Sequence, residues 1–487
     1  MTAASRPASD GTNQDDQDLT RFGYHQQLRR SLSFTDLMVY GLIFMVPIAP
    51  FGIFGGVFAA SGGMVALAYL IGMTGMAFTA LSYSQMSRAF PLAGSVYTYA
   101  GRGIAPAVGF VAGWQILLDY VLVPSLLYLV AGVAMHSFVP AVPVWLWVAG
   151  FVAINTTVNY LGIGLTARIN RLVLVAELVV LVIFLVVGMV ALARGHGGHF
   201  SLRPVYDAHT FSPGLVFGAV SVAVLSFLGF DGISTLAEEN RDGGRQVGRA
   251  MVAALGLAGT LFVVQSWVAA LLVPDRQALL ANGDPTGTAF YDAAEVAGGH
   301  WLNVLTAVAT AISWGFANAM VAQAATSRLL FSMARDRQLP RLLAQVHPVH
   351  LVPAHATVLV AAVSLTIGVA MSGRAGTGVA TLSSLVNFGA LSAFLLLHVS
   401  VFVHHVVRQG SRDWLRHVVV PLAGVVVLGY VLVRAQAAAQ TVGLSWLAIG
   451  LVVLVALFVT GHRPRLAGLD PAGDGPTPSA TGGPEPR

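Results

Sequence analysis

The chain of 487 residues contains no cysteine and no lysine. The absence of cysteine excludes disulfides, thiol catalysis and thiolate metal sites. The absence of lysine excludes catalysis through a Schiff base, and all 26 basic residues are therefore arginines. Charged residues make up only 10% of the chain, against about 25% in an ordinary soluble domain. These absences argue against a soluble enzyme.

The sequence also lacks a phosphate-binding glycine loop, a nucleophile elbow and a zinc motif. Its 14 histidines show no metal-ligand spacing. We therefore expect neither an enzyme nor an ATP-driven pump, and we expect no cofactor and no bound metal. A channel would need a continuous polar pore, and no such pattern is visible. A solute-sensing receptor built on the same scaffold stays open as an alternative.

Long apolar runs take the place of charge, because 56% of the residues are hydrophobic. A run of about 20 apolar residues crosses the roughly 30 Å hydrocarbon core of a bilayer. We expect an all-α polytopic membrane protein, with polar, disordered tails at 1–33 and 466–487 and no cleavable signal peptide. The twelve expected spans are roughly 37–60, 64–87, 107–135, 143–162, 169–193, 213–237, 248–273, 301–333, 355–372, 378–406, 417–434 and 442–461.

The arginines lie mainly in alternate loops. With the N-terminus inside, the inner segments hold 21 arginines and the outer segments hold Arg194, Arg203, Arg276, Arg374 and Arg434. Cytoplasmic loops carry such an excess, so we expect both termini in the cytoplasm and the chain in the cytoplasmic membrane. The net charge of +5 is then a topology signal, and we expect no nucleic-acid partner.

Two of the expected spans are interrupted near their middles. The first span, Leu37–Ala60, contains two prolines and three glycines after residue 46. The sixth span, Pro213–Ala237, contains Gly229, Asp231 and Gly232. In hydrocarbon, a broken helix persists only where other groups satisfy its free ends. Interruptions at equivalent places in two halves of a chain are typical of a transporter's binding site.

The free ends of two such half-helices suit an α-amino acid. Free N–H groups attract a carboxylate, and free carbonyl groups attract an ammonium group. The expected substrate-binding residues are Ile48, Ala49, Pro50, Phe51, Gly52, Leu225, Ser226, Phe227 and Gly229. The alternative is that glycine and proline only kink these helices or let them pack closely.

Asp231 is an acidic residue inside an apolar span, which makes it a candidate for function. It also stands at the start of a resumed half-helix, where its carboxylate would cap the N–H of Ile233, Ser234 or a neighbour. We expect this capping role ahead of direct contact with the substrate. The mixed-charge segment that follows, from Glu238 to Arg249, is either a solvated loop or a gating network with Arg335 and Asp336.

Three strings resemble the amino acid–polyamine–organocation (APC) superfamily. They are FPLAGSVYTYAGRGIAPAVGFVAGWQILLDY (90–120), FLGFDGISTLAEENRD (227–242) and SRLLFSMARDRQLPRLLAQVHPVHLVP (327–353). The resemblance implies a LeuT-like core of two inverted five-helix repeats within twelve transmembrane helices, of which helices 1 and 6 are discontinuous. The implied repeats are 34–193 and 213–406, and 415–461 holds the last two helices.

Within the superfamily, the strings GSVYTYA, GWQILLDY, FLGFDGIS and VNFGALSAF resemble bacterial putrescine importers. This chain has Gly52 where those importers have an aspartate, and a diamine needs carboxylates for its ammonium groups. It also has Leu225 where relatives place an aromatic gate. Both departures favour an amino acid over a polyamine, with a putrescine importer or an amino acid/amine exchanger as the alternative.

The string ARINRLVLVAE (167–177) resembles the start of the fifth span in proton-coupled relatives, which end it with lysine. Here the last residue is Glu177, and a carboxyl group inside a membrane can exchange a proton near neutral pH. We expect Glu177 to be the proton-coupling group, with Asp119 as second candidate and a structural carboxyl as the alternative. A weaker alternative is sodium coupling through Thr326 and Ser327, although such hydroxyls usually bond their own helix.

The sequence thus predicts a secondary transporter that imports amino acids by alternating access, with a small-molecule substrate, protons and the lipid bilayer as its partners.

Overall fold

The computed structural model describes residues 20–23, 28, 30–241, 243–284, 287–373, 375–434, 437–461, 463–464 and 466. Most of the two expected tails, together with Asp242 and Arg374, lies outside the described residues. Within the described part, eleven helices are long and apolar enough to cross a membrane, and a bent pair makes a twelfth span. The expectation of an all-helical protein with twelve spans is therefore confirmed.

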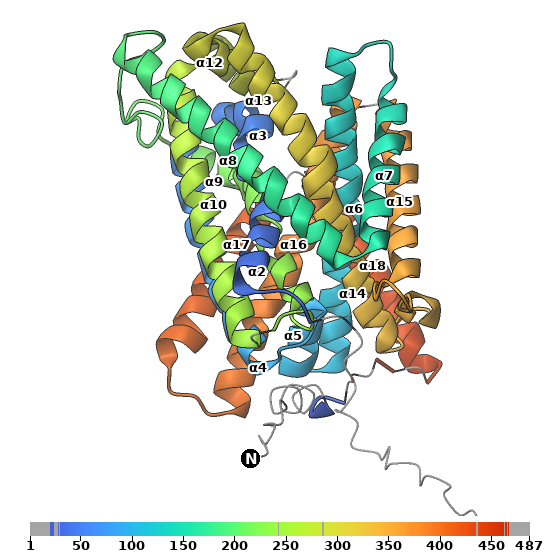
Figure 1. The fold of residues 1–487 in the computed structure, drawn as a ribbon. Coiled ribbons are helices and arrows are strands. Elements are labelled where there is room, and N and C mark those ends of the chain that lie inside the picture. The colour runs from blue at the N-terminus through green and yellow to red at the C-terminus, as the bar shows by residue number, and fades with distance from the viewer. Residues whose placement is uncertain are drawn as a thin grey trace, which may run out of the picture.

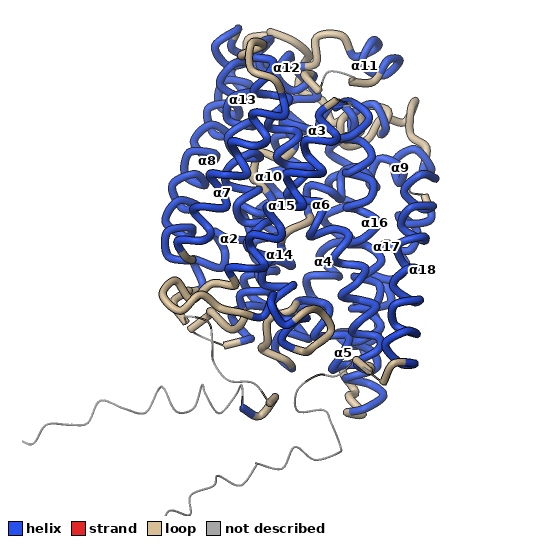
Figure 2. Tube along the Cα trace, turned by 90° about the vertical axis from the view of Figure 1, so that its right-hand side faces the viewer, coloured by secondary structure: helices blue, strands red, loops and turns tan. Residues whose placement is uncertain are grey.

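The spans run roughly parallel through one bundle, with loops and short helices at its two ends (Figures 1 and 2). The first five spans are α2 (Phe34–Met45) with α3 (Pro50–Ala60), α4 (Val65–Ala89), α6 (Pro106–Phe138), α7 (Val144–Leu161) and α8 (Ile163–Ala193). The next five are α9 (Pro213–Ala223) with η1 (Val224–Phe227) and η2 (Phe230–Leu236), α10 (Gly244–Leu272), α13 (His300–Ile312) with α14 (Ala319–Arg335), α15 (Ala354–Ser372) and α16 (Ala375–Val401). The last two are α17 (Val420–Val433) and α18 (Ala437–Val459).

Shorter helices connect or extend the spans. They are α5 (Ser95–Gly103), α11 (Arg276–Asn282), α12 (Ala289–Gly298) and the single turn η4 (Arg341–Ala344). Three π-helical segments, η3 (Ser313–Asn318), η5 (Phe402–Arg408) and η6 (Leu415–Val419), interrupt or extend α-helices. The eighth span runs as one long helix through η3, in agreement with its unusual length in the sequence.

The first span is broken between α2 and α3, whose axes differ by 52°. Ser33 and Asp36 form a capping box that starts α2. Pro47 has no N–H for the helical ladder, and Val46 takes a left-handed backbone with φ of 53°, so α2 ends at Met45. Pro50 then occupies the first turn of α3, where its missing N–H costs nothing.

The sixth span is broken at Leu228 and Gly229. Leu228 is extended and Gly229 has φ of 113°, a conformation that suits glycine and strains other residues. A Cβ added at Gly229 would lie 2.7 Å from the ring of Phe44 on α2. The two breaks therefore touch each other, and both residues lie near the centre of the bundle.

Candidate functional site

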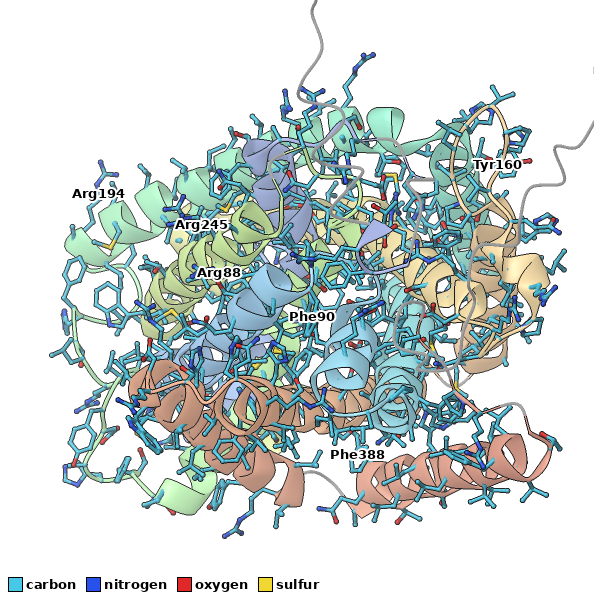
Figure 3. All side chains as sticks on the ribbon, turned by 90° about the horizontal axis from the view of Figure 1, so that it is seen from below. Arg88, Phe90, Tyr160, Arg194, Arg245 and Phe388 are labelled. Atoms are coloured by element: carbon cyan, nitrogen blue, oxygen red, sulfur yellow. The ribbon has the colours of Figure 1, made fainter. Side chains whose placement is uncertain are left out.

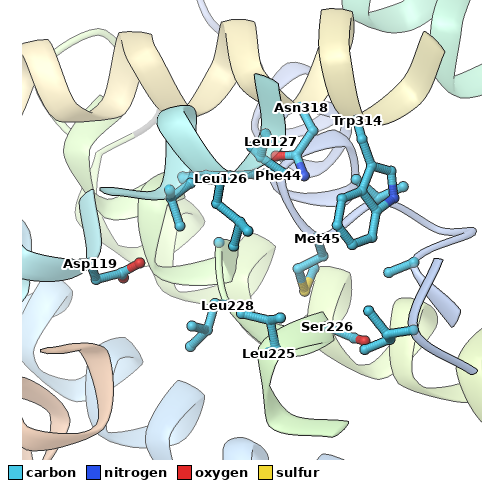
Figure 4. A pocket seen from close by; sticks show the side chains of 15 residues that line it. Phe44, Met45, Asp119, Leu126, Leu127, Leu225, Ser226, Leu228, Trp314 and Asn318 are labelled. Atoms are coloured by element: carbon cyan, nitrogen blue, oxygen red, sulfur yellow. The ribbon is translucent and has the colours of Figure 1, made fainter. Parts of the chain in front are cut away.

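A buried cavity of about 50 Å³ lies where the two broken spans meet. This volume is enough for roughly three or four water molecules. Its walls come from the first, third, sixth and eighth spans, and they are mostly apolar (Figure 4). The lining residues are Phe44, Met45, Val46, Ala49, Ile53, Asp119, Val123, Leu126, Leu127, Leu225, Ser226, Leu228, Gly229, Trp314 and Asn318.

Four polar side chains interrupt the apolar lining. Asp119 of α6 lies at one end of the cavity, and Trp314 lies at the other end (Figure 4). The Ser226 hydroxyl lies 3.3 Å from the Tyr69 hydroxyl. The indole nitrogen of Trp314 and the amide oxygen of Asn318 are buried without a hydrogen-bond partner in the described structure. Both groups are therefore available to a molecule that enters the cavity, because an unpaired buried polar group is costly.

Four of the nine expected substrate-binding residues line the cavity, namely Ala49, Leu225, Ser226 and Gly229. The other five do not line it. Phe51 stacks on Phe290 with ring centroids 4.0 Å apart. Phe227 packs edge-on against Phe262. Both rings therefore pack into the aromatic core and away from the cavity.

Ile48, Pro50 and Gly52 also lie outside the cavity lining. Ile48 is fully buried, and its carbonyl oxygen accepts the Phe51 N–H at 2.9 Å. Pro50 begins α3. Gly52 faces the ring of Trp314, since a Cβ there would lie 3.1 Å from the indole. Gly52 therefore sits behind a lining residue, and any aspartate at this position would displace that indole.

Asp231 does not line the cavity. Its carboxylate accepts a hydrogen bond from the Tyr120 hydroxyl at 2.7 Å and one from the Gly229 N–H at 3.3 Å. Of the expected partners Ile233, Ser234 or a neighbouring N–H, the carboxylate takes a neighbouring one, that of Gly229, which precedes the resumed helix. This pair of hydrogen bonds fixes the break of the sixth span to the third span.

The two expected proton-coupling candidates lie in different surroundings. Asp119 is 4% exposed, and it lines the cavity. Glu177 of α8 is 2% exposed and lies next to Ser313, the residue before the cavity-lining Trp314. Both carboxyl oxygens of Glu177 lack a hydrogen-bond partner in the described structure. Glu177 is thus separated from the cavity by the η3 segment of the eighth span.

The hydroxyls of the weak sodium alternative are bonded to backbone. The Thr326 hydroxyl lies 2.6 Å from the Tyr120 carbonyl oxygen and 2.7 Å from that of Ala322. The Ser327 hydroxyl donates to the Ala324 carbonyl oxygen at 2.8 Å. Neither residue lines the central cavity, and no group of three or more potential metal ligands occurs in the searched part of the chain.

Buried ion pairs join the segment after the sixth span to the end of the eighth span. Arg335 of α14 donates two hydrogen bonds to Glu238, at 2.7 and 2.9 Å. Arg328 pairs with Glu239, and the N–H of Ala93 donates to Glu238 at 3.1 Å. The expected contact of this charged segment with Arg335 is therefore present at Glu238, whereas Asp336 accepts a hydrogen bond from the Tyr97 hydroxyl at 2.7 Å, and a gating role stays a prediction. We call this group, Ala93, Glu238, Glu239, Arg328 and Arg335, the ionic latch.

Sequence reasoning missed ten of the lining residues, namely Phe44, Met45, Val46, Ile53, Val123, Leu126, Leu127, Leu228, Trp314 and Asn318. Trp314 and Asn318 were readable in principle, because a tryptophan and an asparagine deep inside an apolar span are unusual. The direction in which these two side chains point could not be predicted from the sequence. Both residues lie in the π-helical segment η3, where the helical phase changes.

Comparison with known proteins agrees with this geometry. A family model described as "Amino acid permease" matches residues 34–459. The low-affinity putrescine importer PlaP of Escherichia coli (strain K12) is 32% identical over 449 residues, which are 90% of this chain and 96% of PlaP. The branched-chain amino acid permease BcaP of Bacillus subtilis (strain 168) is 26% identical over 403 residues, 78% of this chain and 81% of BcaP. The methylthioribose transporter of the same organism is 27% identical over 461 residues, 88% of this chain and 93% of that protein.

Proposed function

The chain belongs to the amino acid permease family, and from this premise we propose that it imports amino acids into the cell by alternating access. The observation that carries the proposal is the meeting of two broken spans at one buried, mostly apolar cavity. The end of α2 presents carbonyl groups close to this cavity, which suit the ammonium group of an α-amino acid. Pro50 has no N–H, and the N–H groups of Phe51 and Gly52 are bonded to the carbonyl oxygens of Ile48 and Ala49, so the carboxylate would meet the unpaired indole N–H of Trp314 instead.

The remaining lining favours a substrate with an apolar side chain. Leu126, Leu127, Leu225 and Leu228 form much of the wall, and no lining residue carries a positive charge. The named substrate of the BcaP relative, a branched-chain amino acid, would suit such a wall. The small volume of the cavity means that the walls must separate before a substrate enters. Opening and closing of the ionic latch would provide one half of that movement.

We propose that import is coupled to protons through Glu177. A carboxylate that is buried without a partner is unfavourable, so proton uptake at Glu177 would accompany structural change around η3. Ser313, whose side chain lies beside Glu177, belongs to the same segment that carries Trp314 into the cavity. Protonation of Glu177 would thereby change the structure of the substrate site through one turn of helix.

A second candidate function is import of putrescine or a related amine, and Asp119 is the observation that favours it. Its carboxylate lines the cavity and forms no hydrogen bond or ion pair with the described residues. The PlaP relative is named as a putrescine importer and covers most of this chain. In this function Asp119 would hold an ammonium group, in place of the aspartate that is missing at Gly52.

The two candidates are separated by competition in proteoliposomes that contain the purified full chain. Uptake of labelled leucine and of labelled putrescine is measured with and without an inward proton gradient, each against a panel of unlabelled amino acids and amines. The main proposal expects leucine uptake that other apolar amino acids inhibit and that the gradient accelerates. If only amines are taken up, and Asp119→Asn abolishes that uptake, the second function replaces the first.

We propose that the protein resides in the cytoplasmic membrane with both termini in the cytoplasm. The excess of arginines in alternate loops supports this orientation. Because each of the two proposed repeats, 34–193 and 213–406, has five spans, the second would be inverted in the membrane relative to the first.

A further inference from the structure

A groove of about 630 Å³ lies on the outside of the bundle, between the end of α4 and the start of α10. Volumes of this size are typical of sites for small organic ligands. The two helices cross closely here, because Gly244 and Gly248 of α10 face the backbone and side chains of Ser87 and Ser84. The groove is separate from the central cavity and shares no lining residue with it.

The body of the groove is apolar and its end is cationic. Phe34, Leu81, Val252 and Ala253 form the apolar part. Leu81 is 37% exposed although it lies within a membrane span, so this part of the groove opens toward lipid. Arg88 and Arg249 line the end of the groove.

The arginines at this end of the groove outnumber the carboxylates that could pair with them. Arg88 is the penultimate residue of α4, and Arg245 and Arg249 are one turn apart at the start of α10. Figure 3 shows Arg88 and Arg245 over these neighbouring helices. Arg245, Arg416 and Arg249 are all close enough to repel the charge of Arg88. Arg88, Arg245 and Arg249 form no ion pair with any carboxylate of the described residues.

Like charges held together at a helix crossing are unfavourable unless an anion neutralises them. The anion must also reach a groove whose apolar part faces the hydrocarbon of the bilayer. A phospholipid with a net negative headgroup meets both requirements, since its acyl chain would fill the apolar part and its phosphate would meet the arginines. Basic pockets at span ends bind such headgroups in other membrane proteins.

We propose that the groove between α4 and α10 is a binding site for one anionic phospholipid, with Arg88 and Arg249 as its headgroup ligands and Arg245 beside them. A lipid held there bridges two helices whose ends adjoin the ionic latch, since α10 directly follows the segment with Glu238 and Glu239. The site is independent of the substrate that the transporter carries.

The test measures binding of fluorescent phosphatidylglycerol to the full chain in nanodiscs of phosphatidylcholine. The wild type should prefer phosphatidylglycerol to labelled phosphatidylcholine. Each arginine near an anionic headgroup contributes roughly fivefold in affinity, so Arg88→Gln/Arg249→Gln should bind about 25-fold more weakly. The charge-preserving Arg88→Lys/Arg249→Lys should keep most of the preference.

Two further variants separate this site from a general charge effect. Arg194→Gln/Arg203→Gln removes the same charge from exposed positions elsewhere and should bind like the wild type. Ala253→Trp keeps the arginines but fills the apolar part from an exposed position, and it should weaken binding as well. Inorganic phosphate should not displace the lipid, because it lacks the acyl chain.

The proposal is overturned if the wild type shows no preference for phosphatidylglycerol. It is also overturned if the two glutamine double variants lose affinity equally, or if inorganic phosphate alone competes fully. Because the lipid is measured directly, none of these outcomes depends on whether the chain carries amino acids or amines.

Discussion

Glu177 is a carboxyl group buried in α8 with no hydrogen-bond partner in the described structure. Glu177→Gln keeps the shape of the side chain and removes its ability to gain or lose a proton. We expect uptake driven by an imposed pH gradient to collapse in this variant. Exchange of internal for external substrate should persist, because the cavity itself is unchanged.

The measurement is uptake into proteoliposomes at a series of internal and external pH values. Glu295→Gln is the matched control, since Glu295 lies on α12 outside the spans and its carboxylate accepts a hydrogen bond from the Asn303 side chain. Gradient-driven uptake that is unchanged in Glu177→Gln would contradict the assignment and leave Glu177 as a structural carboxyl.

At the scale of elements, the break in the sixth span depends on Gly229. Gly229→Ala would place a Cβ about 2.7 Å from Phe44 in a backbone conformation with φ of 113°. Strain of this kind costs roughly 1–3 kcal/mol, so we expect a lower thermal midpoint and a large loss of uptake. Gly218→Ala is the control in the same span, because nothing lies within 4 Å of its added Cβ. Equal uptake in both variants would show that this break is not needed for transport.

The ionic latch is the second element with a measurable consequence. Burial alone would raise the pKa of Glu238, but the charge and hydrogen bonds of Arg335, together with the Ala93 N–H and the charge of Arg30, outweigh burial and hold this pKa below its ordinary value of 4.5. A group whose pKa is lowered by folding stabilises the protein above its unfolded pKa and loses that contribution as the pH falls through the folded pKa. The latch is therefore intact at neutral pH and weakens in acid below about pH 4.5.

Glu238→Gln should lower the thermal midpoint at pH 7, because it leaves Arg335 without its buried counter-charge, a change that typically costs about 3–5 kcal/mol. The same variant should lose less stability than the wild type between pH 5 and pH 3 (roughly the range around the ordinary pKa of a glutamate). Thermal unfolding in detergent at these pH values checks both statements. Parallel acid profiles for the two proteins would refute the role of Glu238.

At the scale of the whole molecule, the lack of cysteine makes the orientation directly testable. Leu202, in the connection between α8 and α9, is 72% exposed, and Leu342, in η4 between α14 and α15, is 53% exposed. Leu202→Cys should react with a membrane-impermeant maleimide on intact cells. Leu342→Cys should react only after the membrane is opened, and the reverse pattern would invert the proposed topology.

Much of the fold of this protein could be predicted from its sequence. The length of the apolar runs alone predicted the spans, because the hydrocarbon core of a bilayer admits few structures other than helices. Pro47, Pro50 and Gly229 also marked where the two spans break, because proline removes a donor and glycine permits a left-handed backbone. These are local properties of the chain, which is why they can be read without coordinates.

Which side chains face the cavity was decided only by the tertiary structure. The 52° bend turns Phe51 into an aromatic cluster, and the π-helical segment η3 brings Trp314 and Asn318 into the wall. Asp119 and Glu177 are both buried acids in apolar spans, yet only Asp119 reaches the cavity. Side-chain direction depends on how each helix is rotated and tilted against its neighbours. That is a property of packing among distant segments, and no single run of residues specifies it.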